Sequence, residues 1–267
     1  MSLILTRFSV RSRVPDCPAI KGFIETSFVD WKGHLASVLF LGGCNFRCPF
    51  CHNRDLVINP GGFEDVPLEY LIATIRKYRA HWVDKIVVTG GEPTIHKNLF
   101  ELIGLLKSEG MSIKLDTNGS NPSVVKGLVG DGFIDCIAMD VKGPLDRYSR
   151  WCGSKIDEGK IRESIEFIME CGIDYYFRMT VVPFLHQEED VYAVATELQG
   201  SKDLIIQTFR PDITLNPAYE RIKPFSPDKM TRIKANVAGI MSGKGWKRDE
   251  APQVSDLDFR KAEELYP

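Results

Sequence analysis

The sequence predicts an α/β fold built on a parallel sheet. Short apolar, β-branched segments alternate with segments of helical periodicity, and the alternation repeats about six times between residues 35 and 209. Strands that alternate with helices form parallel sheets with right-handed crossovers. In barrels of such repeats, the loops after the strands carry the chemistry. Most of the unusual residues of this chain lie in those loops.

Six strands and six helices are expected in chain order. The strands are expected at residues 35–41, 85–89, 112–116, 134–141, 174–182 and 203–209. The helices are expected at residues 66–78, 98–108, 122–129, 162–171, 191–198 and 227–242. Pro67 suits the first turn of the first helix. The first 30 residues are expected to form a cap or an edge hairpin, and a polar tail follows the last helix.

Composition and charge exclude several classes of protein. The chain has 267 residues, of which 43% are hydrophobic and 26% charged, and its net charge is -2. These values are typical of a globular protein and give no general reason to expect nucleic-acid binding. No apolar run approaches the ~18 residues of a membrane helix. Arg7, Arg11 and Arg13 have no apolar segment behind them, so we expect neither a signal peptide nor a membrane partner.

Cysteine usage is the unusual part of the composition. The chain has seven cysteines, an odd number that argues against a disulfide framework and favours a reducing, cytoplasmic location. Three of them, Cys44, Cys48 and Cys51, follow one another with the spacing C-x3-C-x2-C. The other four are expected to be structural thiols: Cys17, Cys136, Cys152 and Cys171.

The three clustered cysteines lie in a loop that directly follows the first predicted core strand. Gly42, Gly43 and Pro49 oppose a regular helix there. Such a loop can place three thiolates around one soft metal centre. Structural thiols, a zinc site with His52 as fourth ligand, and an iron–sulfur cube with one open iron are the alternatives.

The loop sequence CNFRCPFCHNRD, residues 44–55, resembles the radical S-adenosylmethionine superfamily. Its last four residues, 52–55, are similar to the glycyl radical enzyme activases, which include the activators of pyruvate formate-lyase and of anaerobic ribonucleotide reductase. Residues 22–30 and 37–40 are most similar to the ribonucleotide reductase activators. The resemblance covers roughly residues 20–215. It implies a partial (β/α)6 barrel, with residues 1–267 forming one domain and 225–267 a C-terminal extension.

The resemblance also implies cofactors, partners and an activity. Cys44, Cys48 and Cys51 would hold one 4Fe–4S cluster, whose open iron binds S-adenosylmethionine. Reductive cleavage would give a 5′-deoxyadenosyl radical, which removes a hydrogen atom from a glycine of a partner enzyme. A flavodoxin or ferredoxin would supply the electron. The cofactors carry this chemistry, so no catalytic side chain is expected.

Further motifs lie at the ends of the later predicted strands. The resemblance implies these cosubstrate-binding residues: Phe50, Gly90, Gly91, Glu92, Asp116, Thr117, Asn118, Asp140, Lys142 and Arg178. The two glycines let the backbone come close to a ligand. Lys142 suits the methionine carboxylate, and Arg178 suits that carboxylate or the ribose, with a structural ion pair as its alternative. Some activases hold a monovalent cation near the acidic residues, to which oxygen ligands are suited.

One departure and two alternative functions remain. The pyruvate formate-lyase activator has a cosubstrate-contacting histidine after its last strand, whereas residues 207–211 here contain none. Gln207 or Arg210 is expected to take its place. The chain also lacks a second cysteine cluster. The alternatives are a radical enzyme acting on a small molecule of the modified purine or deazapurine type, and a zinc-stabilised binding protein without enzymatic activity.

Overall fold

A computed structural model describes residues 16–80 and 82–243 of the chain. The three arginines near the N-terminus and the expected polar tail lie outside the described residues. The assignment of residues 1–267 to one domain stays a prediction for the same reason.

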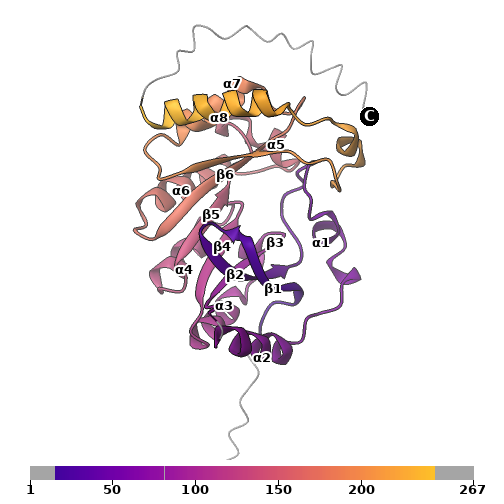
Figure 1. Cartoon of the computed structure of the whole chain (residues 1–267), viewed down its shortest axis with the longest axis vertical. Coiled ribbons are helices and arrows are strands. Elements are labelled where there is room, and N and C mark those ends of the chain that lie inside the picture. Colours follow the sequence, from indigo (N-terminus) through magenta and orange to yellow (C-terminus); the bar gives the residue numbers. More distant parts are fainter. Residues whose placement is uncertain (1–15, 81, 244–267) are drawn as a thin grey trace, which may run out of the picture.

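Seven strands form one sheet whose spatial order follows the chain. The strands are β1 (Ile20–Trp31), β2 (His34–Leu41), β3 (Lys85–Gly90), β4 (Ser112–Thr117), β5 (Cys136–Asp140), β6 (Asp174–Val181) and β7 (Leu204–Thr208). Strand β1 pairs antiparallel with β2, and all later pairs are parallel. Figure 1 shows the sheet curling between α2 at one end and α7 and α8 at the other. The predicted partial barrel is therefore confirmed.

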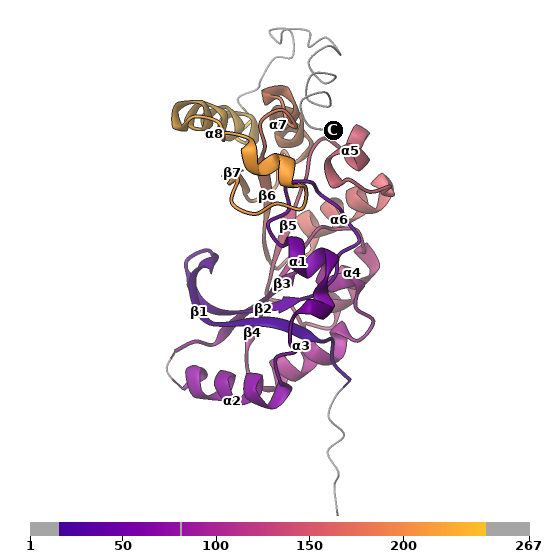
Figure 2. The ribbon, with the colours of Figure 1, turned by 90° about the vertical axis from the view of Figure 1, so that its right-hand side faces the viewer.

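Helices cover the outer side of the sheet, as Figure 2 shows for α3, α4 and α6. The helices are α1 (Arg54–Ile58), α2 (Leu68–Arg79), α3 (Leu99–Ser108), α4 (Pro122–Gly130), α5 (Tyr148–Cys152), α6 (Glu158–Glu170), α7 (Glu188–Glu197) and α8 (Pro227–Met241). All six predicted helices are present. Helices α1 and α5 were not predicted, because five residues are too few for helical periodicity to show.

Two helices begin earlier than the sequence predicts, because polar side chains cap them. The side chain of Asp157 accepts a hydrogen bond from the Gly159 amide at 3.1 Å, so α6 begins at Glu158 rather than 162. The amide of Gln187 donates to Asp190 at 2.8 Å in a capping box, so α7 begins at Glu188 rather than 191. Side-chain oxygens satisfy amides that have no partner inside the helix.

The N-terminal hairpin forms one edge of the sheet. Strand β1 pairs with β2 through three register shifts, and Gly33 turns the chain with a φ of 78°. Register shifts bend a strand, and Figure 2 shows the hairpin leaving the sheet on the side opposite α3 and α4. Within the described residues, β1 thus forms the expected N-terminal edge by pairing with β2, whereas residues 1–15 of the expected segment lie outside the described part of the chain.

Alternate residues of the strands face two different environments, as a pleated strand requires. On the outer side, Leu39, Val88 and Ile137 pack into the main core with the helices. On the inner side, Val38 and Ala138 belong to a second, smaller cluster. The residues that continue this inner face toward the carboxyl ends of the strands are mostly polar. The inner face is therefore apolar around Val38 and Ala138, an area that we call the apolar floor, and polar at the carboxyl ends of the strands.

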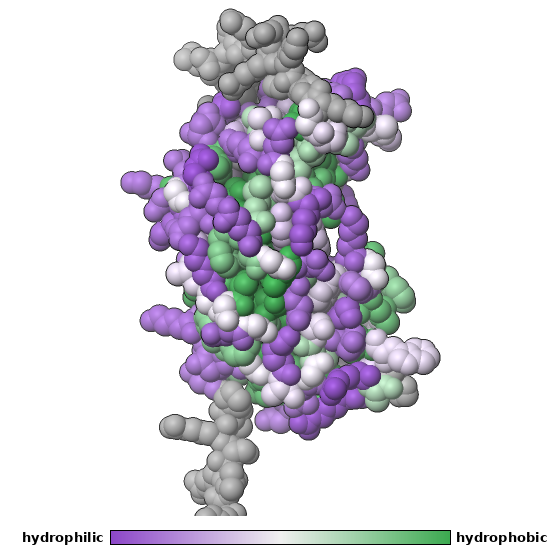
Figure 3. All heavy atoms as spheres, turned by 90° about the vertical axis from the view of Figure 1, so that its left-hand side faces the viewer, coloured by the Kyte–Doolittle hydropathy of each residue, from purple (hydrophilic) through white to green (hydrophobic). Residues whose placement is uncertain are grey.

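Hydrophobic surface forms a bounded area on one side of the molecule. Figure 3 shows hydrophobic side chains gathered near the centre of that side, with hydrophilic side chains around them. Within residues 16–80 and 82–243, no helix is long and apolar enough to cross a membrane.

Candidate cofactor site

The cysteine loop, residues 42–53, connects β2 to α1 and is fixed by backbone hydrogen bonds at several points. The Gly43 amide donates to the Leu56 carbonyl at 2.7 Å, and the Arg47 amide donates to the Cys152 carbonyl at 2.8 Å. The Arg47 guanidinium donates to the carbonyls of Cys44 and Phe46 at 2.6 and 2.8 Å. These contacts curl the loop around Arg47, a residue that the sequence analysis did not single out.

The three thiols of the loop are sheltered from solvent. Cys48 is buried, and Cys44 and Cys51 are partly buried. Burial raises the pKa of Cys44 to about 11 and that of Cys48 to about 12, although the Lys142 charge acts in the opposite direction on both. Burial raises the pKa of Cys51 as well, so each of the three thiols holds its proton more tightly than an exposed cysteine does. A metal centre has to displace these protons, because thiolates are its ligands.

Three cysteine thiols are a donor set that an iron–sulfur cube can use. Among the described residues, no group of three or more His, Cys, Asp or Glu side chains is arranged to hold one metal ion. An iron–sulfur cube does not need such convergence, because each thiolate binds a different iron. His52, the fourth ligand of the zinc alternative, directs Nε2 to the Arg210 carbonyl at 2.6 Å and stacks on Phe209. The observed contacts of His52 thus do not favour zinc.

Two glycines at the end of β3, Gly90 and Gly91, bring a second loop directly against the cysteine loop. The Gly91 amide donates to the Leu41 carbonyl at 2.9 Å, and the Glu92 amide donates to the Gly43 carbonyl at 2.9 Å. A Cβ atom on Gly91 would lie 1.8 Å from the Gly43 oxygen, and one on Gly90 would lie 2.2 Å from the Leu41 oxygen. Gly90 also has a φ of 120°. These glycines are required by contact with the chain's own backbone, in addition to lining the cavity described below.

Glu92 is buried beside the cavity and does not line it. Its Oε1 accepts hydrogen bonds from the amide and hydroxyl of Thr94 and from the Thr117 hydroxyl, at 2.6–3.0 Å. Its Oε2 accepts a hydrogen bond from the Asn118 amide at 2.6 Å. Burial raises the pKa of Glu92, while these donors act in the opposite direction. The carboxylate joins the loops after β3 and β4, so a direct cosubstrate contact stays a prediction.

The loop after β4 also contacts the cysteine loop through side-chain amides. Asn118 Nδ2 donates to Asn45 Oδ1 at 3.0 Å and lies 3.9 Å from the Cys44 sulfur. Asn45 in turn donates to the Ser120 hydroxyl at 2.8 Å. Asn118 therefore connects the β4 end to the first cysteine. Asn45 was missed in the sequence because it lies between two cysteines without a recognisable role of its own.

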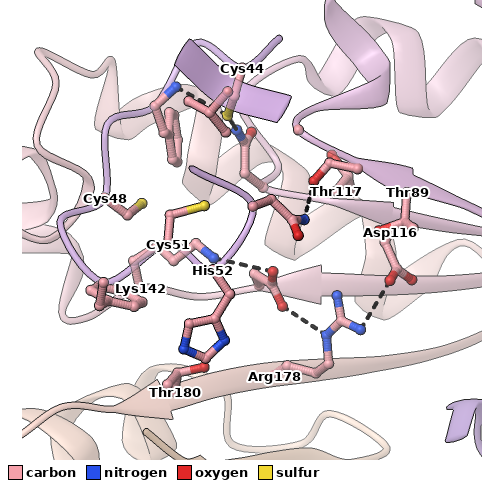
Figure 4. A pocket seen from close by; sticks show the side chains of 18 of the residues that line it. Cys44, Cys48, Cys51, His52, Thr89, Asp116, Thr117, Lys142, Arg178 and Thr180 are labelled. Carbon is pink, nitrogen blue, oxygen red and sulfur yellow. Dashed lines mark hydrogen bonds and ion pairs between the residues drawn. The ribbon is translucent and has the colours of Figure 1, made fainter. Parts of the chain in front are cut away.

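Charged side chains form a row across β4, β5 and β6 at the polar edge of the inner face. Arg178 on β6 donates from Nε to Asp140 at 2.7 Å and from Nη1 to Asp116 at 3.1 Å. Lys142, just after β5, donates to the other Asp140 oxygen at 3.1 Å. Figure 4 shows Arg178 directed toward Asp116, with Lys142 nearer to the cysteines. Asp116 is in register with Ala138 on β5 and Arg178 is in register with Asp140, so the Arg178 side chain reaches Asp116 diagonally across β5.

At Asp140, Lys142 and Arg178, neighbouring charges oppose the effect of burial on the pKa. Burial alone would raise the pKa of Asp140, but the nearby charges of Arg178 and Lys142 hold that pKa well below its usual range. Burial alone would lower the pKa of Lys142 and Arg178. Asp140 raises the pKa of Lys142, and Asp116 together with Asp140 raises that of Arg178. The structural ion pair expected as an alternative for Arg178 is thus present, and its Nη2 is the part of the guanidinium not used by the two carboxylates.

Aromatic side chains and His186 hold the backbone of Lys142. The Lys142 amide donates to the Tyr148 hydroxyl at 3.1 Å, and His186 Nε2 lies 2.8 Å from the Lys142 carbonyl. His186 Nδ1 accepts from the Val182 amide, so Nε2 carries the proton that Lys142 accepts. Burial lowers the pKa of His186 to about 4, which keeps the ring neutral. Phe50, the residue expected near adenine, packs edge-on against this ring.

All but one of the predicted site residues line one cavity of about 360 Å³, Glu92 being the exception. The predicted residues that line it are Cys44, Cys48, Phe50, Cys51, Gly90, Gly91, Asp116, Thr117, Asn118, Asp140, Lys142 and Arg178. Figure 4 shows side chains that line this cavity. At the β7 end Gln207 lines the cavity, as expected for a replacement of the absent histidine, and His52 also lines it. Arg210 is not among the lining residues.

The other four cysteines lie away from the cavity. All seven cysteines are free thiols, which agrees with the expectation of no disulfide framework. Cys136 and Cys152 are buried, and Cys17 and Cys171 are partly buried. The thiol of Cys152 lies 3.1 Å from the Tyr148 carbonyl. The backbone carbonyl of Cys152 accepts a hydrogen bond from the Arg47 amide. The backbone of Cys152 therefore helps to fix the cysteine loop at Arg47.

Comparison with known proteins identifies the family. The family model described as the Radical SAM superfamily matches residues 38–195. A Methanocaldococcus jannaschii protein, provisionally named a glycyl-radical enzyme activating enzyme, is 30% identical over 76% of this chain and 85% of its own length. A 7-carboxy-7-deazaguanine synthase from Neisseria meningitidis is 28% identical over 59% of this chain and 68% of its own length.

A solved structure shows the same fold. Streptococcus suis SuiB bound to S-adenosylmethionine superposes with a TM-score of 0.58 at 16% identity, covering 76% of this chain and 46% of that chain. The chain belongs to the radical S-adenosylmethionine superfamily. It is an enzyme of this type, which uses a 4Fe–4S cluster and S-adenosylmethionine. The resemblance seen in the cysteine loop is thereby confirmed.

Replacing Gly91 by alanine tests the contact between the two loops. The added Cβ would overlap the Gly43 carbonyl, so we expect Gly91→Ala to lower the free energy of unfolding by about 1–3 kcal/mol. Denaturant unfolding of the metal-free protein measures this loss. Gly61→Ala is the matched control, because a Cβ there meets nothing within 4 Å. Equal stability of both variants would contradict the close approach.

Replacing Glu92 by glutamine tests the buried carboxylate. Glutamine has one acceptor oxygen, so its amide group would face either the Asn118 amide or the Thr94 amide. A buried donor left without an acceptor costs about 1–3 kcal/mol. We expect this loss for Glu92→Gln in thermal unfolding, and less than about 0.5 kcal/mol for Glu101→Gln, an exposed carboxylate on α3. A neutral effect of Glu92→Gln would show that the carboxylate is not required.

Proposed function

We propose that this enzyme generates a glycyl radical on a partner enzyme, of which an anaerobic ribonucleotide reductase is the first candidate. The observation that carries the proposal is the cysteine loop with its continuation His52–Asp55, together with the activating enzyme relative that matches most of the chain. Cys44, Cys48 and Cys51 would hold the cluster. When bound, the cluster supplies the electron that converts S-adenosylmethionine to methionine and the 5′-deoxyadenosyl radical, which takes a hydrogen atom from a glycine Cα.

The described residues support this chemistry by binding and orientation. The charged row offers Lys142 and Arg178 to the methionine carboxylate, close to the three thiols. Phe50 offers an apolar surface to the adenine. Holding the cosubstrate in one orientation replaces a chance encounter with a unimolecular step. No proton transfer by a side chain is required, since the cofactors carry the reaction.

A small-molecule substrate is the second candidate, and the deazaguanine synthase relative favours it. The two candidates share the cofactors and differ in what donates the hydrogen atom. The electron donor proposed for either is a flavodoxin or a ferredoxin. We also propose a cytoplasmic location, because seven free cysteines suit a reducing compartment.

Cleavage of the cosubstrate tests the cysteine assignment. Protein purified without oxygen, loaded with iron and sulfide and then reduced, is expected to form 5′-deoxyadenosine, measured by mass spectrometry. Cys48→Ala is expected to abolish both iron binding and cleavage, because one of three cluster ligands is lost. Cys171→Ala removes a thiol at the end of α6 and is expected to retain both. Cleavage by Cys48→Ala would contradict the ligand assignment.

Electron paramagnetic resonance tests the partner. Incubation with an anaerobic ribonucleotide reductase from the same organism is expected to produce the doublet of a glycyl radical, absent when that glycine is replaced by alanine. If cleavage proceeds but no doublet appears, and 7-carboxy-7-deazaguanine forms from a small-molecule extract instead, the second candidate is correct.

A further inference from the structure

Lys114 is a buried cation that the site described so far does not use. It lies on the inner face of β4, two residues before Asp116, and its side chain has no solvent exposure. Its ammonium donates to Asp116 at 2.5 Å and to the Tyr176 hydroxyl at 3.0 Å. Around it lies the apolar floor of the inner face, with Cys136 and Ala138 as the next residues on β5. Burying an ammonium in such surroundings costs free energy that its hydrogen-bond and charge partners have to offset.

Asp116 has a second cationic partner besides Lys114. Arg178 already donates to Asp116 Oδ2, and Lys114 occupies the remaining oxygen, Oδ1. Asp140 has both of its oxygens paired as well, one with Arg178 and one with Lys142. Without Lys114, two cations would still face two carboxylates. Lys114 is therefore the charge that makes the row unbalanced.

The charges of the row and of Lys114 can be counted together. Lys114, Arg178 and Lys142 contribute three positive charges, while Asp116 and Asp140 contribute two negative ones. The row and Lys114 together thus carry one surplus positive charge. Lys114 does not line the cavity, whereas Arg178 and Lys142 do. A ligand in the cavity can therefore contact Arg178 and Lys142 directly, but not Lys114.

We propose that Lys114 is a positioning residue that pairs with Asp116 and so leaves Arg178 and Lys142 with a net positive charge for the carboxylate of S-adenosylmethionine. In its absence, Asp116 and Asp140 would balance both cations, and the cavity would lose its preference for an anionic ligand. The proposal rests on the use of S-adenosylmethionine by this enzyme. It does not depend on which partner receives the radical.

Other charged groups near the cavity do not alter the expected difference. Asp30 of β1 lines the cavity, and its carboxylate accepts a hydrogen bond from the Ser27 hydroxyl. Glu92 lies behind the loops, paired with Thr94, Thr117 and Asn118. Both are unchanged when Lys114 is replaced. Any replacement of Lys114 by a neutral residue lowers the local charge by one.

The test compares binding of two cosubstrates that differ in the carboxylate. Cluster-loaded protein in the unreduced state is titrated in a calorimeter with S-adenosylmethionine and with its decarboxylated analogue. Lys114→Met is expected to weaken binding of S-adenosylmethionine about tenfold or more, since one charge within a partly buried site is removed. Binding of the decarboxylated analogue is expected to change less than about threefold. Lys114→Gln keeps a donor toward Asp116 without the charge, and the same result is expected if the methionine variant does not fold.

Two further variants separate charge from structure. Lys126→Met removes a positive charge from an exposed ion pair on α4 and is expected to leave both affinities unchanged. Lys114→Met combined with Asp116→Asn restores one surplus positive charge, so S-adenosylmethionine binding is expected to return to within about threefold of the parent.

The possible outcomes decide between the two roles of Lys114. Equal losses for both cosubstrates would show that Lys114 is structural, and no loss for either would show that its charge is unimportant. A double variant as weak as Lys114→Met would also overturn the charge argument. If the parent enzyme itself does not bind S-adenosylmethionine, the cofactor assignment fails rather than this inference.

Discussion

The close approach of two glycine-containing loops determines where everything else in the site can lie. Gly91 passes so near the Gly43 carbonyl that no side chain fits between them. The contact sets the cysteine loop against the carboxyl end of β3, and Glu92 then connects the same point to the end of β4. A ligand bound by the cysteines would therefore face the inner edge of the sheet. The glycines have a structural necessity that is independent of any ligand.

The parallel sheet provides the second half of the site. Because the carboxyl ends of parallel strands meet at one edge, residues far apart in sequence, such as Asp116 and Arg178, become neighbours. Below this edge the inner face is apolar, which strengthens the interactions among the charges above it. His186 and Tyr148 fix the backbone of Lys142, so the row has a defined position next to the thiols. Binding and orientation are what these residues can contribute to a reaction that the cofactors perform.

Strand and helix order could be predicted from the sequence because hydrophobic periodicity is a local property. The bounds of α6 and α7 could not, since caps at Asp157 and Gln187 decide them. The motifs at the strand ends identified most residues that line the cavity. Lys114 and His186 were missed, because neither lines the cavity and each contacts a residue that does, Asp116 and Lys142 respectively. Lys114 carried a weak local signal, since it precedes Asp116 by two positions and so shares its face of the strand.

We propose that Cys44, Cys48 and Cys51 would hold the cluster next to the charged row, where S-adenosylmethionine would bind. Electron–nuclear double resonance on the reduced cluster, with S-adenosylmethionine labelled with ¹³C at the carboxylate, tests it most directly. We expect a resolved coupling between the cluster and the labelled carbon. A bound cosubstrate that shows no coupling to the cluster would contradict it.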